Sequence, residues 1–438
     1  MSKPVLSAHF ESRTPSDVRL AQMSYAERKV KPEAVVNVSI GNVSLPTNPA
    51  MMNRMFNLDA PDSPFNKGVI RYTATGGFAE TQDAFINILN AQGFDTSNLE
   101  VIVTDGGSTA MELLIVGVCG PAGTDESPLM MIDPAYTNYL SFAQRLGRKT
   151  VSVKRTIDSN GKFTLPEISE IEKVIEKHKP SALLVIPYDN PTGQLYDMET
   201  IKELAGLCVK HNMWLVSDEA YRELFYLEGS DLVSIWALNN DIVPGIEGRR
   251  IGIETASKVW NACGLRIGAI VTDSPEFSNR GQAEYTANLC ANAIGQYIFG
   301  ALAHESKESI NNWCGDLRNY YGDTIKNVTK RFNELKPELI ISSPDASIYS
   351  VIDVRNVVKP GFDSVEFSLF CASEGEVDLN GVKTTLLSAP MKGFYDIPEG
   401  EHNPGSTQFR ISYVEEPEKM MTVPDLFIDL LDQFEAQR

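Results

Sequence analysis

The sequence predicts an α/β protein with a large domain, whose mostly parallel sheet is sandwiched by helices, and a smaller α+β domain. The first observation is a series of short apolar runs rich in Val, Ile and Leu, at 100–104, 128–133, 181–187, 213–218, 250–257 and 268–273. Each run is continuous rather than alternating, which indicates strands buried on both faces. The second observation is that helix-like segments separate several of these runs, which favours a parallel sheet.

The individual elements follow in order from local patterns. A helix is predicted at 108–118, and another at 197–212, where apolar residues recur at helical spacing behind an acidic start. Beyond about residue 305 the pattern changes. The segment 316–337 predicts a long amphipathic helix, whereas 346–354 and 407–414 alternate like half-exposed strands.

The length of 438 residues predicts two domains, because chains above about 250–300 residues usually divide. We expect the large domain at 55–310 and the C-terminal small domain at 311–438. Residues 1–54 have no strong periodicity. We expect them to form an N-terminal arm and part of the small domain, wrapped around that domain or around a neighbouring subunit.

The composition excludes several classes of protein. The formal net charge of -19 argues against nucleic acid or an anionic membrane as the main partner. No apolar run is long enough to span a bilayer, and the N-terminus lacks the apolar core of a signal peptide. The six cysteines form no C-x-x-C pair and the five histidines are scattered, so we expect reduced thiols and no metal site. Together these features predict a cytoplasmic protein.

Polar residues follow the predicted strands, at the sheet edge where open α/β sheets bind ligands. Gly106 and Gly107 permit a tight turn after the first run. Ser108 and Thr109 would then open a helix, whose free N–H groups and hydroxyls suit a phosphate. Taken alone, the same residues also suit a plain turn and helix cap. Tyr136, after the second run, would either stack on a flat ligand or simply pack.

The later strands end on residues with more chemistry. Asn190 follows the third run, Asp218 the fourth, and Lys258 with Arg266 the fifth. Singly, these suit a turn, a helix cap and solvated cations. Together with the phosphate site they form the set that pyridoxal phosphate requires. A lysine bonds the aldehyde, an acid keeps the ring nitrogen protonated, and hydroxyls with a second cation hold the phosphate.

The motifs at these positions resemble those of the fold-type I pyridoxal phosphate enzymes, specifically the class I/II aminotransferases. The lysine signature is matched by "TASKVWNACGLRIG" at 255–268, and departs from the family pattern only at Thr255, where Gly or Ser is usual. Four more motifs occur in the family's order: "YTATGG" at 72–77, "NPTG" at 190–193, "DEAY" at 218–221 and "FRISY" at 409–413. The resemblance extends from about residue 35 to the C-terminus.

The resemblance implies roles for individual residues. Lys258 is the lysine that bonds the cofactor and later carries the proton, with Asp218 and Tyr221 as the other catalytic residues. Asp218 pairs with the ring nitrogen, and Asn190 and Tyr221 bind the phenolic oxygen. The implied cofactor-binding set is Tyr72, Gly107, Ser108, Thr109, Tyr136, Asn190, Asp218, Tyr221, Thr255, Ser257, Lys258 and Arg266, with Tyr72 reaching across from the other subunit of a homodimer. The implied substrate-binding set is Gly41, Asn190 and Arg410, with Arg410 clamping the substrate α-carboxylate.

The activity implied is transfer of an amino group between an L-amino acid and a 2-oxo acid by a ping-pong mechanism. A C–S β-lyase, or a related lyase or decarboxylase on the same site, is the alternative, since the core motifs do not separate these reactions. A cofactor-binding regulator of nucleic acid is disfavoured by the acidic charge and the short N-terminal extension. Aspartate, aromatic and branched-chain donors all remain open, because Arg280 is the only arginine between 267 and 317 and has no predicted place in the pocket.

Overall fold

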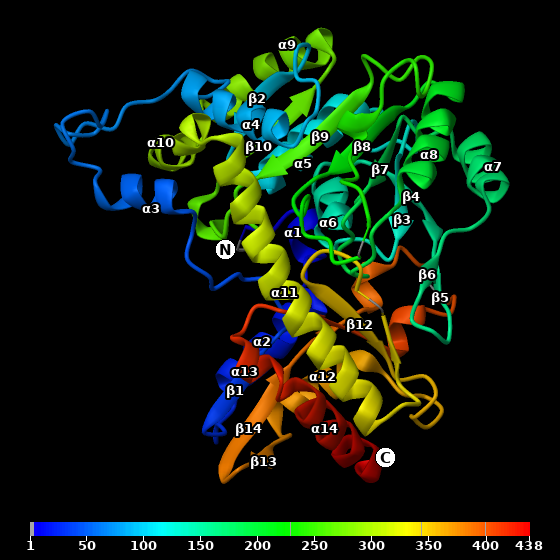
Figure 1. The fold of residues 1–438 in the computed structure, drawn as a ribbon. Helices are drawn as coiled ribbons and strands as arrows, with labels where there is room; N and C mark the ends of the chain where they lie inside the picture. The colour runs from blue at the N-terminus through cyan, green and yellow to red at the C-terminus, as the bar shows by residue number, and fades with distance from the viewer. Residues whose placement is uncertain (1–3, 228, 343, 399) are drawn as a thin grey trace.

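A computed structural model describes residues 4–227, 229–342, 344–398 and 400–438. Its centre is a seven-stranded sheet in the order β2-β10-β9-β8-β7-β3-β4 (Figure 1). All neighbouring strands are parallel except β10, which is antiparallel to both of its neighbours. The strands are β2 Glu100–Thr104, β3 Leu129–Asp133, β4 Thr150–Lys154, β7 Ala182–Val185, β8 Trp214–Asp218, β9 Arg250–Thr255 and β10 Gly268–Thr272. The α/β class and all six predicted strands are confirmed.

Continuous apolar strands are explained by helices on both faces of this sheet. In β10, Ala269 and Val271 face one core and Ile270 faces the other. The first core is completed by α4 Ala79–Ala91, α7 Ile168–His178 and α8 Met198–Lys210. The second is completed by α5 Gly106–Val118, α6 Asn138–Arg145 and α9 Pro275–Tyr285. Both faces of the central strands are therefore removed from water, which explains why their sequences are continuously apolar.

The lower lobe in Figure 1 is built from two smaller sheets. A four-stranded sheet has the order β11-β12-β16-β15, and a three-stranded sheet has the order β1-β14-β13. The strands are β1 Ala34–Asn37, β11 Ile340–Ile341, β12 Tyr349–Asp353, β13 Val377–Leu379, β14 Val382–Leu387, β15 Ala389–Pro390 and β16 Gln408–Ser412. Helices α12 Ser364–Ser373 and α14 Val423–Gln437 pack on this lobe. The long helix α11 Lys307–Leu335 runs from the upper lobe to the lower one.

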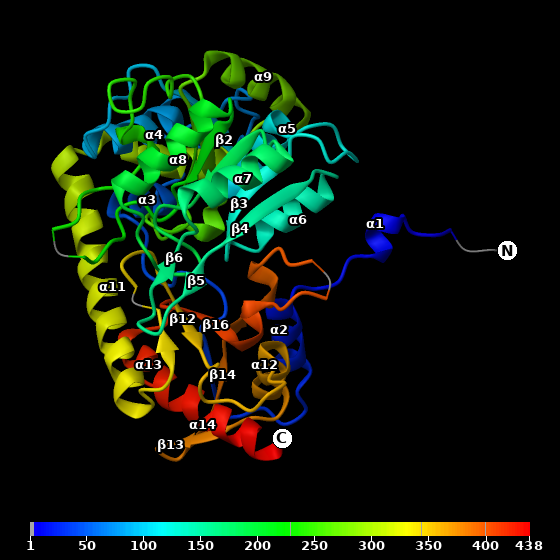
Figure 2. The same ribbon diagram turned by 90° about the vertical axis from the view of Figure 1, so that its right-hand side faces the viewer.

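The N-terminal segment belongs to the lower lobe in this chain. Strand β1 pairs in parallel with β14, and helix α2 Asp17–Glu27 packs against α12. The short helix α1 Ala8–Glu11 extends away from the body of the molecule (Figure 2). No helix among the described residues is long and apolar enough to cross a membrane.

Two predictions about the lower lobe need correction. The long helix begins at Lys307 rather than at residue 316, because Ser306 caps it by accepting a hydrogen bond from the Ser309 amide. The prediction that 346–354 and 407–414 are half-exposed strands is wrong, since every residue of β12 and β16 is buried. Their polar residues are satisfied inside the protein: Ser350 bonds the Tyr413 hydroxyl, and the Ser412 hydroxyl donates to the Val38 carbonyl.

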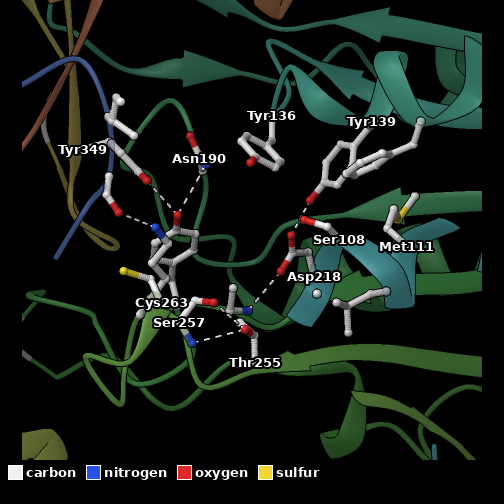
Figure 3. Close-up of a pocket in the computed structure, with 18 of the residues that line it drawn as sticks. Ser108, Met111, Tyr136, Tyr139, Asn190, Asp218, Thr255, Ser257, Cys263 and Tyr349 are labelled. Atoms are coloured by element: carbon white, nitrogen blue, oxygen red, sulfur yellow. Dashed lines mark hydrogen bonds between the residues drawn. The ribbon is translucent and has the colours of Figure 1, made fainter. Parts of the chain in front are cut away.

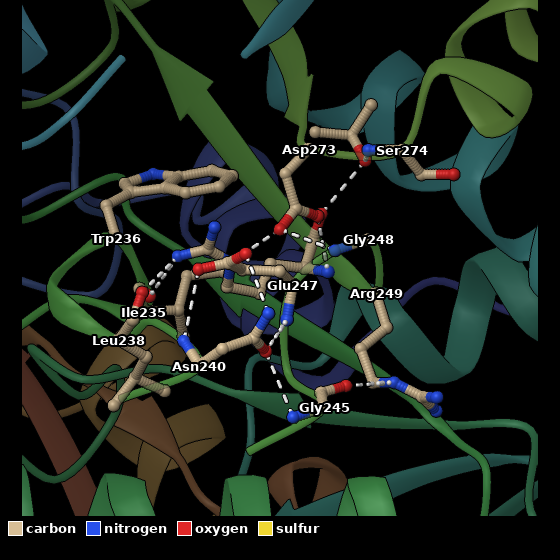
Figure 4. Close-up of polar contacts among 12 residues, drawn as sticks. Ile235, Trp236, Leu238, Asn240, Gly245, Glu247, Gly248, Arg249, Asp273 and Ser274 are labelled. Carbon is tan, nitrogen blue, oxygen red and sulfur yellow. Dashed lines mark hydrogen bonds and ion pairs between the residues drawn. The ribbon is translucent and has the colours of Figure 1, made fainter. Parts of the chain in front are cut away.

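A polar cluster lies at the end of the large sheet remote from the carboxyl ends of its parallel strands (Figure 4). The Arg250 side chain, at the start of β9, donates through Nε to Asp273 Oδ2 at 2.7 Å. Asp273 also accepts from the amides of Gly248 and Arg250, and a second guanidinium nitrogen of Arg250 donates to the Leu238 carbonyl. The buried arginine is thus paired and hydrogen-bonded, as burial of a charge requires.

Asp133, at the end of β3, joins the large sheet to the lower lobe. Its Oδ2 accepts from the Ser152 hydroxyl and from the Asp396 amide, both at 2.7 Å, while Oδ1 is buried without a partner in the described structure. Burial raises the pKa of Asp133 to about 6 from its ordinary 3.8. The folded state therefore favours the protonated carboxyl.

We expect Asp133→Asn to gain stability relative to the unmodified chain as the pH rises. Below about pH 4 the native carboxyl is protonated both folded and unfolded, so its stabilisation is fully present there and is lost as the pH passes about 6. Asparagine keeps the acceptor oxygen without the charge. Urea denaturation measures the free energy of unfolding of the variant and of the unmodified protein. The difference between the two proteins should change by about 2 kcal/mol between pH 4 and pH 7.5. A difference that is the same at both pH values would contradict this account.

Candidate active site

A cavity of about 250 Å³ opens where the carboxyl ends of the parallel strands face the lower lobe (Figure 3). Its position is the one expected for ligands of an open α/β sheet. Residues from both lobes line it. The predicted residues that line it are Gly41, Gly107, Ser108, Tyr136, Asn190, Asp218, Tyr221, Thr255, Ser257, Lys258, Arg266 and Arg410.

One end of the cavity is suited to an anion. Helix α5 begins at Gly106, which has a φ of +79°, and a Cβ there would lie 2.5 Å from Arg266 Nη2. Glycine at this position therefore allows the guanidinium to lie against the helix start. The hydroxyls of Thr255 and Ser257, 2.8 Å apart, lie at the end of β9 close by. Unbonded N–H groups of the first helical turn, hydroxyls and a guanidinium are the donors that bind phosphate.

Asp218 ends β8 in the middle of the cavity. Its Oδ1 accepts from the Ala220 amide at 3.0 Å, and its Oδ2 accepts from the Tyr139 hydroxyl. Burial raises the pKa of Asp218, although these two hydrogen bonds act in the opposite direction. A cationic ring nitrogen beside it would supply the charge that a buried carboxylate needs.

Tyr139 was not among the predicted site residues. It lies in α6, one turn after Tyr136, and the two rings meet edge to face with centroids 5.4 Å apart. The Asn138 side chain donates to the Tyr136 hydroxyl at 2.7 Å and holds that ring at the cavity wall. Tyr136 lies just before α6 and Tyr139 lies in its first turn, where the Tyr139 amide donates to the Tyr136 carbonyl at 3.1 Å. The three-residue spacing across this turn was the available signal.

Arg410, in β16, is a buried cation with part of its hydrogen-bonding capacity unused. It donates to Asn190 Oδ1 at 3.1 Å and to the Ser39 carbonyl at 2.7 Å, but its Nε has no partner in the described structure. Buried donors are rarely left unsatisfied in native proteins. A carboxylate ligand in the cavity is the natural partner for such a group.

Lys258 and Tyr221 complete the centre of the site. The Lys258 amine donates to the Gly41 carbonyl, which lies on the loop after β1. The Tyr221 hydroxyl lies 2.8 Å from that of Tyr349 and accepts from the Asn190 amide at 3.4 Å. Burial raises the pKa of Tyr221 well above its ordinary value, so the phenol keeps its proton and remains a donor. Tyr349 was also absent from the predicted set.

Two predicted residues do not reach the cavity of this chain. The Thr109 hydroxyl donates to the Asp105 carbonyl within α5, at 3.2 Å. Tyr72 lies on the segment after α3 Pro49–Phe56, with 79% of its surface exposed.

These groups fit one kind of cofactor. The helix start with Arg266 suits a phosphate, Asp218 suits a protonated ring nitrogen, and the Lys258 amine lies in the same cavity. The Nε of Arg410, which has no hydrogen-bond partner among the described residues, suits the carboxylate of a second molecule. The fold and the site together define an α/β enzyme that uses pyridoxal phosphate.

Comparison with known proteins gives the family. Residues 34–379 match the family model of class I and II aminotransferases, and the chain belongs to this family. Its members use pyridoxal phosphate to exchange amino groups between amino acids and oxo acids, and this chain is such an enzyme. An aspartate aminotransferase of Pyrococcus horikoshii is 25% identical over 405 residues, which are 90% of each chain. One of Thermotoga maritima is 24% identical over 375 residues, 84% of this chain and 90% of the relative.

Solved structures show the same fold. A mutant of Thermus thermophilus aspartate aminotransferase superposes with a TM-score of 0.77 at 20% identity, covering 98% of this chain and all of the other. The kynurenine aminotransferase of Pyrococcus horikoshii gives a TM-score of 0.77 at 18% identity, covering 98% of this chain and 97% of the other. The predicted family, fold, enzyme class and cofactor are thereby confirmed.

Proposed function

We propose that this enzyme acts on α-amino acids through Lys258, Asp218 and Arg410 as its three principal groups. The observation that carries this proposal is their convergence on one cavity, which brings together the Lys258 amine, the half-buried Asp218 carboxylate and the Arg410 guanidinium, whose Nε has no partner among the described residues. The phosphate would be held by the start of α5 together with Ser108, Thr255 and Arg266. Tyr136 would face the ring, and Asn190 and Tyr221 would bind its phenolic oxygen.

When bound, pyridoxal phosphate supplies an electron-withdrawing ring that stabilises negative charge on the substrate Cα. Arg410 orients the amino acid by gripping its carboxylate. Lys258 would hold the cofactor through its amine and, as the base nearest to the substrate, would move the Cα proton. Asp218 would keep the ring nitrogen protonated. Positioned proton transfer of this kind contributes about 10²–10⁴ in rate.

A panel of amino acid donors with 2-oxoglutarate, read by glutamate formation, tests the proposal and identifies the donor. Aspartate, aromatic and branched-chain amino acids are the first to compare. A second arm supplies a cysteine conjugate without any oxo acid. Glutamate formation supports transamination, whereas release of pyruvate without an acceptor would identify the C–S lyase instead.

We expect Arg410→Ala to raise KM for the amino donor by about 10- to 100-fold, because a charge-assisted pair with the carboxylate is lost. Steady-state kinetics measure this effect. Arg331→Ala is the matched control, since Arg331 pairs with Asp425 on the surface, outside the cavity. An unchanged KM in the Arg410 variant would remove this residue from the carboxylate site.

We further propose that the enzyme is a cytoplasmic homodimer with shared active sites. Large apolar side chains are exposed at the end of α3 and on the stretch that follows it, and a second copy would cover them: Phe56, Val69, Ile70 and Tyr72. Figure 1 draws this stretch as a loop that projects from the upper lobe between α3 and α4. In such a dimer Tyr72 would serve the partner's phosphate site. Sedimentation at micromolar concentration tests this, and a monomer would contradict it.

The proposed domain division remains 1–54, 55–310 and 311–438, with the first part joining the third. The pairing of β1 with β14 supports this assignment. The six cysteines are all free thiols, which is compatible with a reducing compartment.

A further inference from the structure

Tyr349 lies where the two lobes meet at the cavity. It begins β12 in the lower lobe and is only 2% exposed. Its hydroxyl lies 2.8 Å from that of Tyr221, which belongs to the upper lobe, and the two rings meet edge to face with centroids 5.6 Å apart. This contact joins the small lobe directly to a residue proposed to bind the cofactor.

The ring of Tyr349 makes a second contact, with Arg410. The guanidinium carbon lies 4.4 Å from the centroid of the Tyr349 ring and 5.1 Å from that of Phe394. Arg410 is on β16, the strand paired with β12. Two aromatic faces therefore hold the guanidinium, and such contacts strengthen when they are desolvated. The rings fix the plane in which Arg410 presents its donors.

Gly41 makes room for the Tyr349 hydroxyl. A Cβ at residue 41 would lie 2.1 Å from this oxygen and 3.1 Å from the Lys258 amine. Any side chain at this position would therefore displace the tyrosine. The glycine loop, the lysine, and the pair of tyrosines thus pack as one unit around the centre of the cavity.

We propose that Tyr349 is a positioning residue with two separable effects: its hydroxyl directs the proton of Tyr221 towards the cofactor, and its ring orients Arg410 towards the substrate carboxylate. This inference rests on the roles proposed above for Tyr221 and Arg410. It adds Tyr349 as the residue through which the small lobe acts on both.

The direction of the hydrogen bond follows from the number of protons available. Tyr221 has one proton, and if it donates this to the phenolic oxygen of the ring, its own oxygen must act as an acceptor. The Asn190 amide reaches that oxygen at 3.4 Å, at the long limit of a hydrogen bond, whereas Tyr349 reaches it at 2.8 Å. Tyr349 is therefore the stronger donor. Its donation polarises the Tyr221 O–H bond and strengthens the bond to the cofactor.

The test compares Tyr349→Phe with Tyr349→Leu in the cofactor-loaded enzyme. A donor to the phenolic oxygen stabilises the deprotonated form of the bound cofactor, because this oxygen carries the most negative charge in that form. Losing the Tyr349 hydroxyl should raise the pH midpoint of the cofactor's absorbance change by about half a unit. Phenylalanine keeps the ring, so KM for the amino acid should stay within about twofold. Leucine should show the same shift and in addition raise KM about fivefold.

Tyr413→Phe is the matched control. Tyr413 is also fully buried beside β16, and its hydroxyl also lies 2.8 Å from another hydroxyl, that of Ser350, but it does not line the cavity. This variant should lose a comparable amount of stability in thermal unfolding without moving the absorbance midpoint. A shift of the same size in the control would assign the effect of Tyr349 to general packing and overturn the inference.

Tyr221→Phe distinguishes a failure of the inference about Tyr349 from a failure of the proposed site. If it moves the midpoint and Tyr349→Phe does not, the inference about Tyr349 fails while the proposed site stands. If the unmodified protein shows no cofactor absorbance, or Tyr221→Phe leaves the midpoint unchanged, the proposed roles themselves fail. If Tyr349→Phe moves the midpoint but Tyr349→Leu leaves KM unchanged, the effect on Arg410 is disproved.

Discussion

Lys258→Ala is expected to lose the absorbance of the covalently held cofactor and at least about 10³-fold in turnover. The side chain supplies both the amine that bonds the cofactor and the base that moves the Cα proton. Among the described residues, the Lys258 amine has one hydrogen-bond partner, the backbone carbonyl of Gly41. Its removal therefore breaks no buried ion pair, and the fold should survive. Absorbance spectra and single-turnover kinetics measure the two effects separately.

Lys330→Ala serves as the control for the Lys258 variant, because Lys330 is exposed on α11 and forms a surface ion pair with Glu334, four residues on. It should keep full absorbance and turnover. A small primary amine added to the Lys258 variant should restore part of the proton transfer, since alanine leaves space where the lysine chain lay. A Lys258 variant that transaminates at the normal rate would show that another group carries the chemistry.

The parts of the site that follow strands could be predicted from the sequence. Asn190, Asp218 and Lys258 each come directly after an apolar run, and parallel strands bring their carboxyl ends to one edge. Local sequence order therefore fixes their place in space. The residue types then limit the chemistry, since few ligands require an amide, an acid and an amine together.

Contacts between lobes could not be predicted in this way. Tyr349 and Tyr221 are 128 residues apart and meet only because the small lobe packs over the sheet edge. Nothing in the segment 346–354 distinguishes Tyr349 from an ordinary core residue. The burial of β12 and β16 was missed for a related reason. Ser350 and Ser412 suggest exposure, but hydrogen bonds to Tyr413 and to a carbonyl allow them to be buried.

One of the two edge strands of the large sheet was missed. β4 Thr150–Lys154 was not predicted, although it completes the sheet beside β3. Its sequence, TVSVK, alternates and is mostly half-buried, whereas β2 at the other edge is apolar and buried after Glu100. The continuous apolar pattern that identified the other six strands is therefore absent from β4.

Asp218→Asn is expected to lower kcat by at least about 10²-fold while the cofactor remains bound through Lys258. Asparagine has the size of aspartate and still offers an oxygen to the Tyr139 hydroxyl, so the geometry should be kept. What it removes is the negative charge beneath the ring nitrogen. Without that charge the ring nitrogen is less readily protonated, and the carbanion at Cα is stabilised less. Pre-steady-state measurement of Cα deuterium transfer would isolate this step.

Asp197→Asn is a matched control, because Asp197 caps α8 by accepting from the Thr200 amide and asparagine caps equally well. Both changes remove one negative charge, but only Asp218 lies in the cavity. Burial raises the pKa of Asp218 in the protein alone, and a cationic ring nitrogen beside it would act in the opposite direction. An Asp218→Asn variant with normal kcat would place the ring nitrogen against some other group.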